Sequence, residues 1–160
     1  MDDKYKNMLT IGIALVSCFI FYVATRPCIF IKNEQGLIYN FIIKDNDFIS
    51  LKYIHSVEKT EVIEKIGLDA KNALVLKETC YKSYGAGLPF CLKQGIFRQD
   101  GDWFIISDIN KKLDNLDLRV SKNSKLKINY SGQDYNLFDE IDNNSVVNIR
   151  VGKYYNKYFL

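Results

Sequence analysis

The sequence predicts an all-β domain, an antiparallel β-sandwich or barrel of about nine to eleven short strands, preceded by one N-terminal transmembrane helix. Three observations support this prediction. Residues 8–24 contain no charged residue. Beyond Pro27, apolar and polar residues alternate with a period of two, and Gly, Asn, Asp and Ser separate the alternating segments. The chain has 160 residues, 48% of them hydrophobic, which is enough for one folded domain with a buried core.

The N-terminal apolar run reads MLTIGIALVSCFIFYVA and is seventeen residues long. This length is at the lower limit for a helix that crosses a hydrocarbon core about 30 Å thick. A buried helix of a soluble domain would present a polar face, and this run has none. We therefore predict a short tail at residues 1–7, a transmembrane signal anchor at residues 8–24 and a β domain at residues 29–160. Basic residues on both sides leave the orientation open: Lys4 and Lys6 before the run, Arg26 and Lys32 after it.

The segment Leu15-Val16-Ser17-Cys18 offers an alternative, because it resembles a bacterial lipobox. In that alternative the chain is cleaved before Cys18, and the cysteine carries lipid. Residues 19–23, FIFYV, continue the apolar run beyond the cysteine, whereas a lipoprotein becomes polar there. This continuation favours an uncleaved anchor.

The segments predicted as strands are short, apolar on alternate residues and bounded by turn residues. They comprise residues 38–43, 48–57, 60–68, 73–82, 96–99, 102–107, 116–121, 125–130, 133–137 and 145–151. The clearest hairpin lies around Asp100-Gly101, a dipeptide that suits the positive φ angles of a tight turn. Within the domain, a turn of helix fits only at residues 110–115.

Charge and residue spacing exclude some classes of function. The 22 basic and 19 acidic residues are mixed along the chain and leave a net charge of +3, without a basic run. The sequence therefore does not predict nucleic-acid binding. The spacing of the single histidine, His55, relative to Glu58, Glu61 and Cys80 matches no zinc pattern. We predict neither a metal nor a cofactor.

The stretch YIHSVEKTEVIEK at residues 53–65 holds the first candidate site. His55 falls on the same alternating face as Leu51 and Tyr53, so one interpretation is a ring that packs at the end of a sheet and bonds a backbone carbonyl. The other interpretation is a polar cluster at a turn. There a neutral imidazole and a carboxylate would orient a ligand or exchange a proton.

The stretch SYGAGLPF at residues 83–90 holds the second candidate site. Gly85 and Gly87 permit positive φ angles or close backbone approach. The loop is therefore either a wide turn fixed by Pro89 or a concave nest of amide groups for an anion.

These two motifs also carry a resemblance to a known family. The chain has Asp47-Phe48, YIHSVEKT at residues 53–60, Glu64 and SYGAGLP at residues 83–89. It resembles the domain of unknown function family eighteen-fifty over most of residues 29–151. The resemblance implies a short, N-terminally anchored bacterial protein whose β domain lies outside the cytoplasmic membrane. It also implies a gene beside TRAP-type solute transporters of the TAXI subgroup, and it implies no biochemical activity.

We expect the two motifs to form one surface. In a three-stranded antiparallel meander, the turn after the first strand and the exit of the third strand lie at the same edge. This arrangement would bring residues 55–60, here called the HSVE turn, to residues 83–89, the GAGLP loop. The predicted ligand- or partner-binding residues are His55, Ser56, Glu58, Lys59, Thr60, Glu64, Ser83, Tyr84, Gly85, Gly87 and Pro89.

Two functions from different classes fit these motifs. The first is a membrane-anchored extracytoplasmic accessory module of TRAP/TAXI-type solute uptake, which recognises a transporter subunit, a solute-binding protein or its carboxylate solute. The alternative is a small extracytoplasmic enzyme with His55 and Glu58 as acid and base. The sequence favours the first, because no nucleophile accompanies these residues and SYGAG is not the GxSxG elbow. A deep pocket at both residues would favour the enzyme.

In an oxidising compartment, Cys80 and Cys91 are the natural disulfide pair, because they bracket the GAGLP loop. Cys18 lies inside the apolar run and Cys28 at its edge. A bridge from Cys28 to Cys80 or Cys91 is the rival connectivity, and free thiols are a third possibility.

Overall fold

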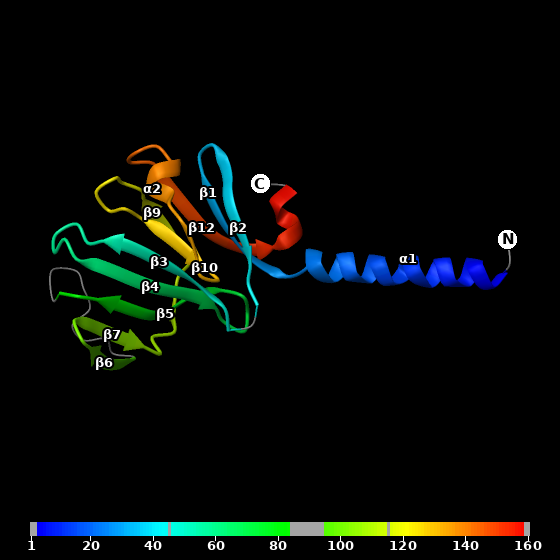
Figure 1. The fold of residues 1–160 in the computed structure, drawn as a ribbon, viewed down its shortest axis with the longest axis horizontal. Coiled ribbons are helices and arrows are strands. Elements are labelled where there is room, and N and C mark those ends of the chain that lie inside the picture. The colour runs from blue at the N-terminus through cyan, green and yellow to red at the C-terminus, as the bar shows by residue number, and fades with distance from the viewer. Residues whose placement is uncertain (1–2, 45, 84–94, 115, 159–160) are drawn as a thin grey trace.

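The computed structural model describes residues 3–44, 46–83, 95–114 and 116–158. Figure 1 shows a long N-terminal helix followed by two antiparallel β-sheets that pack face to face. The predicted fold class, an antiparallel β domain behind one apolar helix, is confirmed. The elements are α1 (Asp3–Ala24), β1 (Pro27–Asn33), β2 (Gly36–Ile42), β3 (Phe48–Ile54), β4 (Glu61–Leu68), β5 (Leu74–Tyr81), β6 (Ile96–Asp100), β7 (Trp103–Ser107), β8 (Lys111–Lys112), β9 (Leu116–Arg119), β10 (Lys127–Tyr130), β11 (Gln133–Tyr135), α2 (Leu137–Glu140), β12 (Val146–Lys153) and the 3₁₀ turn η1 (Tyr154–Tyr158).

The larger sheet contains the predicted meander. Its strand order is β11-β10-β3-β4-β5-β7-β6, and β8 pairs with β5 beside this path. In the β3–β4–β5 meander, Tyr53 lies opposite Val62, which lies opposite Tyr81. The turn that follows β3 and the chain that leaves β5 are therefore at the same end of the sheet, as predicted.

The smaller sheet has the order β2-β1-β12-β9. Its inner face packs on the larger sheet, and the core between them contains many fully buried aliphatic side chains. Burial of each such side chain stabilises the fold by about 1.5–3 kcal/mol. Those of the smaller sheet include Ile29, Ile31, Val147 and Ile149, and those of the larger sheet include Ile49, Leu51, Ile66 and Ile128.

The first strand, β1, was not predicted. Its residues Cys28, Ile29, Phe30 and Ile31 are all buried, so the segment reads as a continuous apolar run without alternation. A short run of this kind cannot be distinguished from the end of an apolar helix by periodicity alone. β1 is buried on both faces because the core covers one face and η1 lies against the other, where Asn156 of η1 and Phe30 of β1 both lie close to Gly152.

Three predicted boundaries were wrong, one because of a local turn bond and two because of contacts more distant in sequence. β3 ends at Ile54 rather than residue 57, because the amide of His55 donates to the carbonyl of Thr60 and closes a turn. Residues Lys111–Lys112 form β8 through pairing with β5, where a turn of helix was expected. A strand was predicted to reach residue 137, but the single helical turn α2 begins there, and the amide of Phe138 donates to the carbonyl of Leu126.

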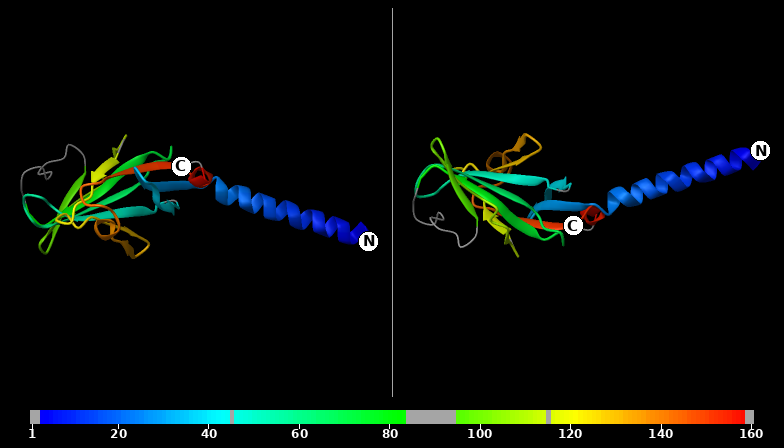
Figure 2. Two further views of the ribbon diagram at one scale, coloured as in Figure 1. Left: turned by 90° about the horizontal axis from the view of Figure 1, so that it is seen from above. Right: turned by 90° about the horizontal axis from the view of Figure 1, so that it is seen from below.

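The helix α1 extends away from both sheets (Figures 1 and 2). Residues Lys4–Ala24 are long and apolar enough to cross a membrane, with a mean hydropathy of 2.0 over an 18-residue stretch. Large apolar side chains are exposed all around it, for example Ile11, Phe19 and Phe21. The helix runs without interruption through Cys18 to Ala24.

Candidate functional site

The HSVE turn lies at the end of the larger sheet farthest from α1 (Figure 1). The carbonyl of His55 accepts a hydrogen bond from the amide of Lys59 at 3.0 Å, and Nδ1 of His55 accepts one from the amide of Glu58 at 3.2 Å. Lys59 adopts a left-handed conformation, with φ of 57°, which reverses the chain. Because Nδ1 is an acceptor, the neutral imidazole carries its proton on Nε2.

One side-chain hydrogen bond joins the two motifs. Oγ of Ser83, the first residue of the GAGLP loop, donates to Oε2 of Glu58 at 2.9 Å. Both residues are half-buried, and they are 25 positions apart in sequence. The structure therefore brings together His55, Glu58 and Ser83 among the predicted residues. The imidazole holds the turn internally, and the carboxylate fastens the turn to the start of the loop.

The other predicted residues of the HSVE turn have different surroundings. Ser56 and Lys59 are exposed, and Val57, which was not predicted, is 63% exposed at the tip of the turn. Oγ1 of Thr60 is buried and has no hydrogen-bond partner in the described part of the chain. The turn thus presents one apolar and two polar side chains to solvent beside a buried hydroxyl.

An ion pair and an aromatic ring adjoin this site; the sequence placed Glu61 in the polar cluster but assigned Lys82 and Trp103 no part in it. Nζ of Lys82 lies 2.6 Å from the Glu61 carboxylate and 4.6 Å from the centroid of the Trp103 ring. These residues come from β4, from the end of β5 and from β7. Only the strand register brings them together, so no local sequence signal could have found them. We call residues 55–61, Lys82, Ser83 and Trp103 together the distal end.

A hollow of about 360 Å³ lies beside the distal end. It is lined by Lys52, Tyr53, Ile54, Glu61, Val62, Ile63, Lys125, Lys127 and Asp134. Asp134 pairs with Lys52 at 2.9 Å. Lys125 and Lys127 have no carboxylate within ion-pair distance among the described residues, so the hollow carries positive charge. Neither His55 nor Glu58 lines it.

Glu64 does not join this cluster. Its register partners are Leu51 and Thr79, which places it on the core-facing side of the sheet. Burial raises the pKa of the Glu64 carboxyl, and the charge of Lys111 opposes this shift in part. Burial, followed by the charge of Glu64, also raises the pKa of Tyr53. The Glu64 carboxyl is therefore half-buried on the core-facing side of the larger sheet, away from the HSVE turn, and its predicted ligand role stays a prediction.

Tyr84, Gly85, Gly87, Pro89 and Cys91 lie outside the described residues, so their predicted roles stay predictions. Cys80 is buried with a free thiol, and its Sγ donates to Oε1 of Glu78 at 3.4 Å. Burial, followed by the charge of Glu78, raises the pKa of this thiol to about 11. Cys28 is also buried, but it lies in β1 of the other sheet.

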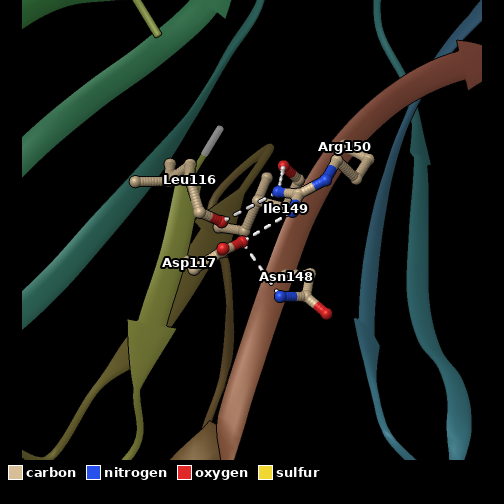
Figure 3. Close-up of polar contacts among 5 residues, drawn as sticks. All are labelled: Leu116, Asp117, Asn148, Ile149 and Arg150. Atoms are coloured by element: carbon tan, nitrogen blue, oxygen red, sulfur yellow. Dashed lines mark hydrogen bonds and ion pairs between the residues drawn. The ribbon is translucent and has the colours of Figure 1, made fainter. Parts of the chain in front are cut away.

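A second polar network lies on the smaller sheet (Figure 3). Asp117 of β9 accepts from Nδ2 of Asn148 at 2.9 Å and pairs with Arg150 at 2.7 Å. The hydrogen bond from Asn148, and then those from Arg150, hold the pKa of Asp117 below its ordinary value. Arg150 also donates to the carbonyl of Ile149 at 3.0 Å. Asp117 of β9 and Arg150 of β12 neutralise each other across paired strands, so we infer that this network stabilises the pairing of β9 with β12.

Within the described ranges, no three His, Cys, Asp or Glu side chains are grouped to hold a metal ion. Comparison with known proteins gives one match. A family model described as a domain of unknown function (DUF1850) matches residues 49–137, which include both motifs and run from β3 to the start of α2. No curated protein matches the chain, and no solved structure matches it.

Proposed function

The chain belongs to the DUF1850 family, and from this premise we propose that it is a membrane-anchored, extracytoplasmic accessory module of TRAP/TAXI-type solute uptake. In this proposal α1 crosses the cytoplasmic membrane, and the distal end recognises a component of the transporter. The observation that carries the recognition role is the hydrogen bond between Glu58 and Ser83, which fastens one motif to the other.

The position of the distal end supports a partner outside the bilayer. The carbonyl of Pro27 accepts a hydrogen bond from the amide of Ile43, so the start of β3 lies near the end of α1. β3 then runs seven residues away from that point, about 20 Å at 3.3 Å per residue. A surface at this distance from the membrane suits a soluble solute-binding protein better than a membrane-embedded subunit.

The contacts of the two motif side chains favour recognition over turnover. Nδ1 of His55 and the carboxylate of Glu58 are both engaged in bonds that hold the turn and the loop. General acid–base catalysis needs such groups within hydrogen-bond reach of a substrate. The exposed groups are Ser56, Val57 and Lys59, an arrangement suited to contact with another surface.

The positive hollow beside the distal end supports an acidic binding partner. Lys125 and Lys127 would attract carboxylates of a partner protein or of its solute. Trp103 adds a large aromatic surface of the kind enriched at protein interfaces.

The test is copurification from membranes. The tagged full chain is expressed with the solute-binding protein and the membrane subunits of its TRAP/TAXI transporter. Val57→Asp and Lys59→Glu alter exposed side chains of the HSVE turn and leave its hydrogen bonds in place. The matched control is Lys71→Glu, an exposed lysine in the turn between β4 and β5, at the opposite end of the same meander.

We expect the unaltered chain and Lys71→Glu to retain the solute-binding protein, and the two HSVE-turn variants to lose it by about tenfold or more. Retention by all four proteins would contradict the distal end as the recognition surface. Absence of every transporter component from the purified unaltered chain would contradict the accessory role itself.

A further inference from the structure

We propose that η1 lies in the lipid headgroup layer of the membrane, with Tyr155 and Tyr158 at headgroup level and Arg26, Lys153 and Lys157 facing lipid phosphates. This inference rests on the proposed membrane insertion of α1. It goes further, because it assigns a lipid-binding surface to the β domain, formed by the far end of the chain.

The position of η1 is the first observation. The amide of Tyr154 donates to the carbonyl of Arg26 at 2.9 Å, so η1 begins beside the first residues after α1. Figures 1 and 2 show the red turn next to the end of the blue helix in every view. Because Ala24 ends the uncharged run of α1, this level of the molecule is where a spanning helix would leave the hydrocarbon.

The attachment of η1 to the domain is the second observation. It contacts α1, β1 and β2. A Cβ on Gly152 would lie 2.9 Å from Nδ2 of Asn156 and 3.1 Å from Cε2 of Phe30, so glycine permits close packing of the turn against β1. η1 is therefore a fixed part of the domain, and its orientation relative to α1 follows from β12 and β1.

The side chains of η1 have the chemistry of a membrane interface. Tyr155 is 44% and Tyr158 is 74% exposed. Nζ of Lys157 lies 4.0 Å from the ring centroid of Tyr154 and 4.8 Å from that of Tyr158. Tyrosine is enriched at membrane interfaces because its ring is apolar and its hydroxyl polar. Lysine and arginine extend along such rings and place their charge at the headgroups.

The end of α1 repeats this combination of residues. The guanidinium of Arg26 lies 5.3 Å from the ring centroid of Tyr22, and Nη1 donates to the Tyr22 hydroxyl at 3.1 Å. Tyr22 is 58% exposed. Two cation–tyrosine groups from opposite ends of the chain thus flank the point where the helix meets the domain.

Two acidic side chains at this end of the sandwich, those of Asp47 and Asp69, are hydrogen-bonded within the protein. The carboxylate of Asp47 accepts from the Tyr130 hydroxyl at 3.2 Å. The carboxylate of Asp69 accepts from the amides of Lys71 and Ala73 at 2.8 and 2.9 Å. Asp69 also pairs with Lys112 at 3.6 Å, whereas exposed Lys153 has no acidic partner in the part of the chain that the structure describes. Charge complementarity therefore favours an anionic lipid surface.

The test places a single fluorescent reporter on η1. Trp103, the one tryptophan, is replaced in the full chain by Trp103→Phe, and Tyr158→Trp or Tyr155→Trp is added. The protein is reconstituted into vesicles of phosphatidylcholine and phosphatidylglycerol that contain phosphatidylcholine brominated near the start of its acyl chains. The matched control is Trp103→Phe with Phe97→Trp, because Phe97 is 52% exposed on β6, far from α1 in Figure 1.

We expect brominated lipid to lower the emission of both η1 reporters about twofold and to leave the Phe97→Trp control unchanged. Lys153→Glu with Lys157→Glu should weaken quenching of the Tyr155→Trp reporter, whereas Lys59→Glu at the distal end should not. Omission of phosphatidylglycerol from the vesicles should also weaken quenching of the Tyr155→Trp reporter.

The outcomes separate this inference from the proposed anchor. If alkaline carbonate releases the chain from the vesicles, the membrane anchor itself is wrong. If the chain resists extraction but the η1 reporters are quenched no more than the control, η1 is not in the headgroup layer. Quenching that persists unchanged in the double lysine variant and without phosphatidylglycerol would contradict the contact with lipid phosphates.

Discussion

Glu58 connects two motifs that are separate in sequence, through one bond to Ser83. The carboxylate is charged, and hydrogen bonds to charged groups are stronger than those between neutral groups. Loss of either partner leaves the other polar group half-buried and unpaired. The hydrogen bond therefore stabilises the distal end and fixes where the GAGLP loop begins.

A double-mutant cycle tests this bond. We expect Glu58→Ala and Ser83→Ala each to lower the free energy of unfolding by about 1–2 kcal/mol, and the double variant to lower it scarcely further. The measurement is chemical denaturation of the full chain in detergent. Ser56→Ala is the control, because Ser56 is exposed in the same turn and should change the free energy by under about 0.5 kcal/mol. Additive effects of the two substitutions would show that the bond contributes nothing.

Because of Glu64, we expect the stability of the fold to change with pH in the opposite direction from the change that an ion-paired carboxylate would cause. Burial raises its pKa in the folded state above the unfolded value of about 4.3. Its proton therefore stabilises the fold fully below that unfolded value, and this stabilisation is lost as the pH rises through the folded pKa.

We expect the Tm of Glu64→Gln minus the Tm of the unaltered chain to increase as the pH rises from about 4 to 8, because the unaltered chain loses the stabilising proton of Glu64. The measurement is thermal unfolding of both proteins across that range. Glu34→Gln, at an exposed position in the turn between β1 and β2, is measured in parallel as the control for loss of a carboxylate. A constant gap for Glu64→Gln would mean that its carboxyl is solvated.

At the level of elements, β1 and η1 depend on each other. η1 covers the outer face of β1, and burial raises the pKa of the Cys28 thiol in β1 to about 11, while the nearby charge of Lys157 opposes that shift. The pairing of β1 with both β2 and β12 makes it a central strand of the smaller sheet. An apolar strand directly after α1 therefore joins the helix to the core.

Matched isoleucine substitutions test the role of β1. Ile31→Ala removes a fully buried side chain of β1, and we expect it to lower the free energy of unfolding by about 2–5 kcal/mol. Ile96→Ala is the control, because Ile96 is 60% exposed on β6 and should cost under about 1 kcal/mol. Both are measured by denaturant unfolding. Similar losses for the two variants would contradict β1 as a core strand.

At the scale of the whole molecule, the helix and the distal end lie at opposite ends (Figure 1). If α1 spans the membrane with residues 1–7 in the cytoplasm, the entire β domain lies outside. We expect protease added to intact spheroplasts to digest the β domain, as detected with a C-terminal tag. Survival of the domain until the cells are lysed would reverse the orientation. A cytoplasmic protein that stays intact is the control for spheroplast integrity.

The sequence alone was sufficient for the fold class, the apolar helix and the meander. Each depends on local periodicity: an uncharged run for α1, and alternation between turns for β3, β4 and β5. The meander then predicted that the HSVE turn and the start of the GAGLP loop share one edge, because antiparallel strands with short turns leave few alternatives. The bond between Glu58 and Ser83 agrees with that geometry.

Only the tertiary structure decided the features that depend on distant contacts. β1 lacks alternation because η1 and the core bury its two faces, and η1 is more than 100 residues away. Glu64 was predicted as a ligand residue, and the strand register places it opposite Leu51 on the core-facing side of the larger sheet. Lys82 and Trp103 meet through the pairing of β5 with β7. Periodicity reports which side of a strand a residue occupies, whereas long-range packing determines what covers that side.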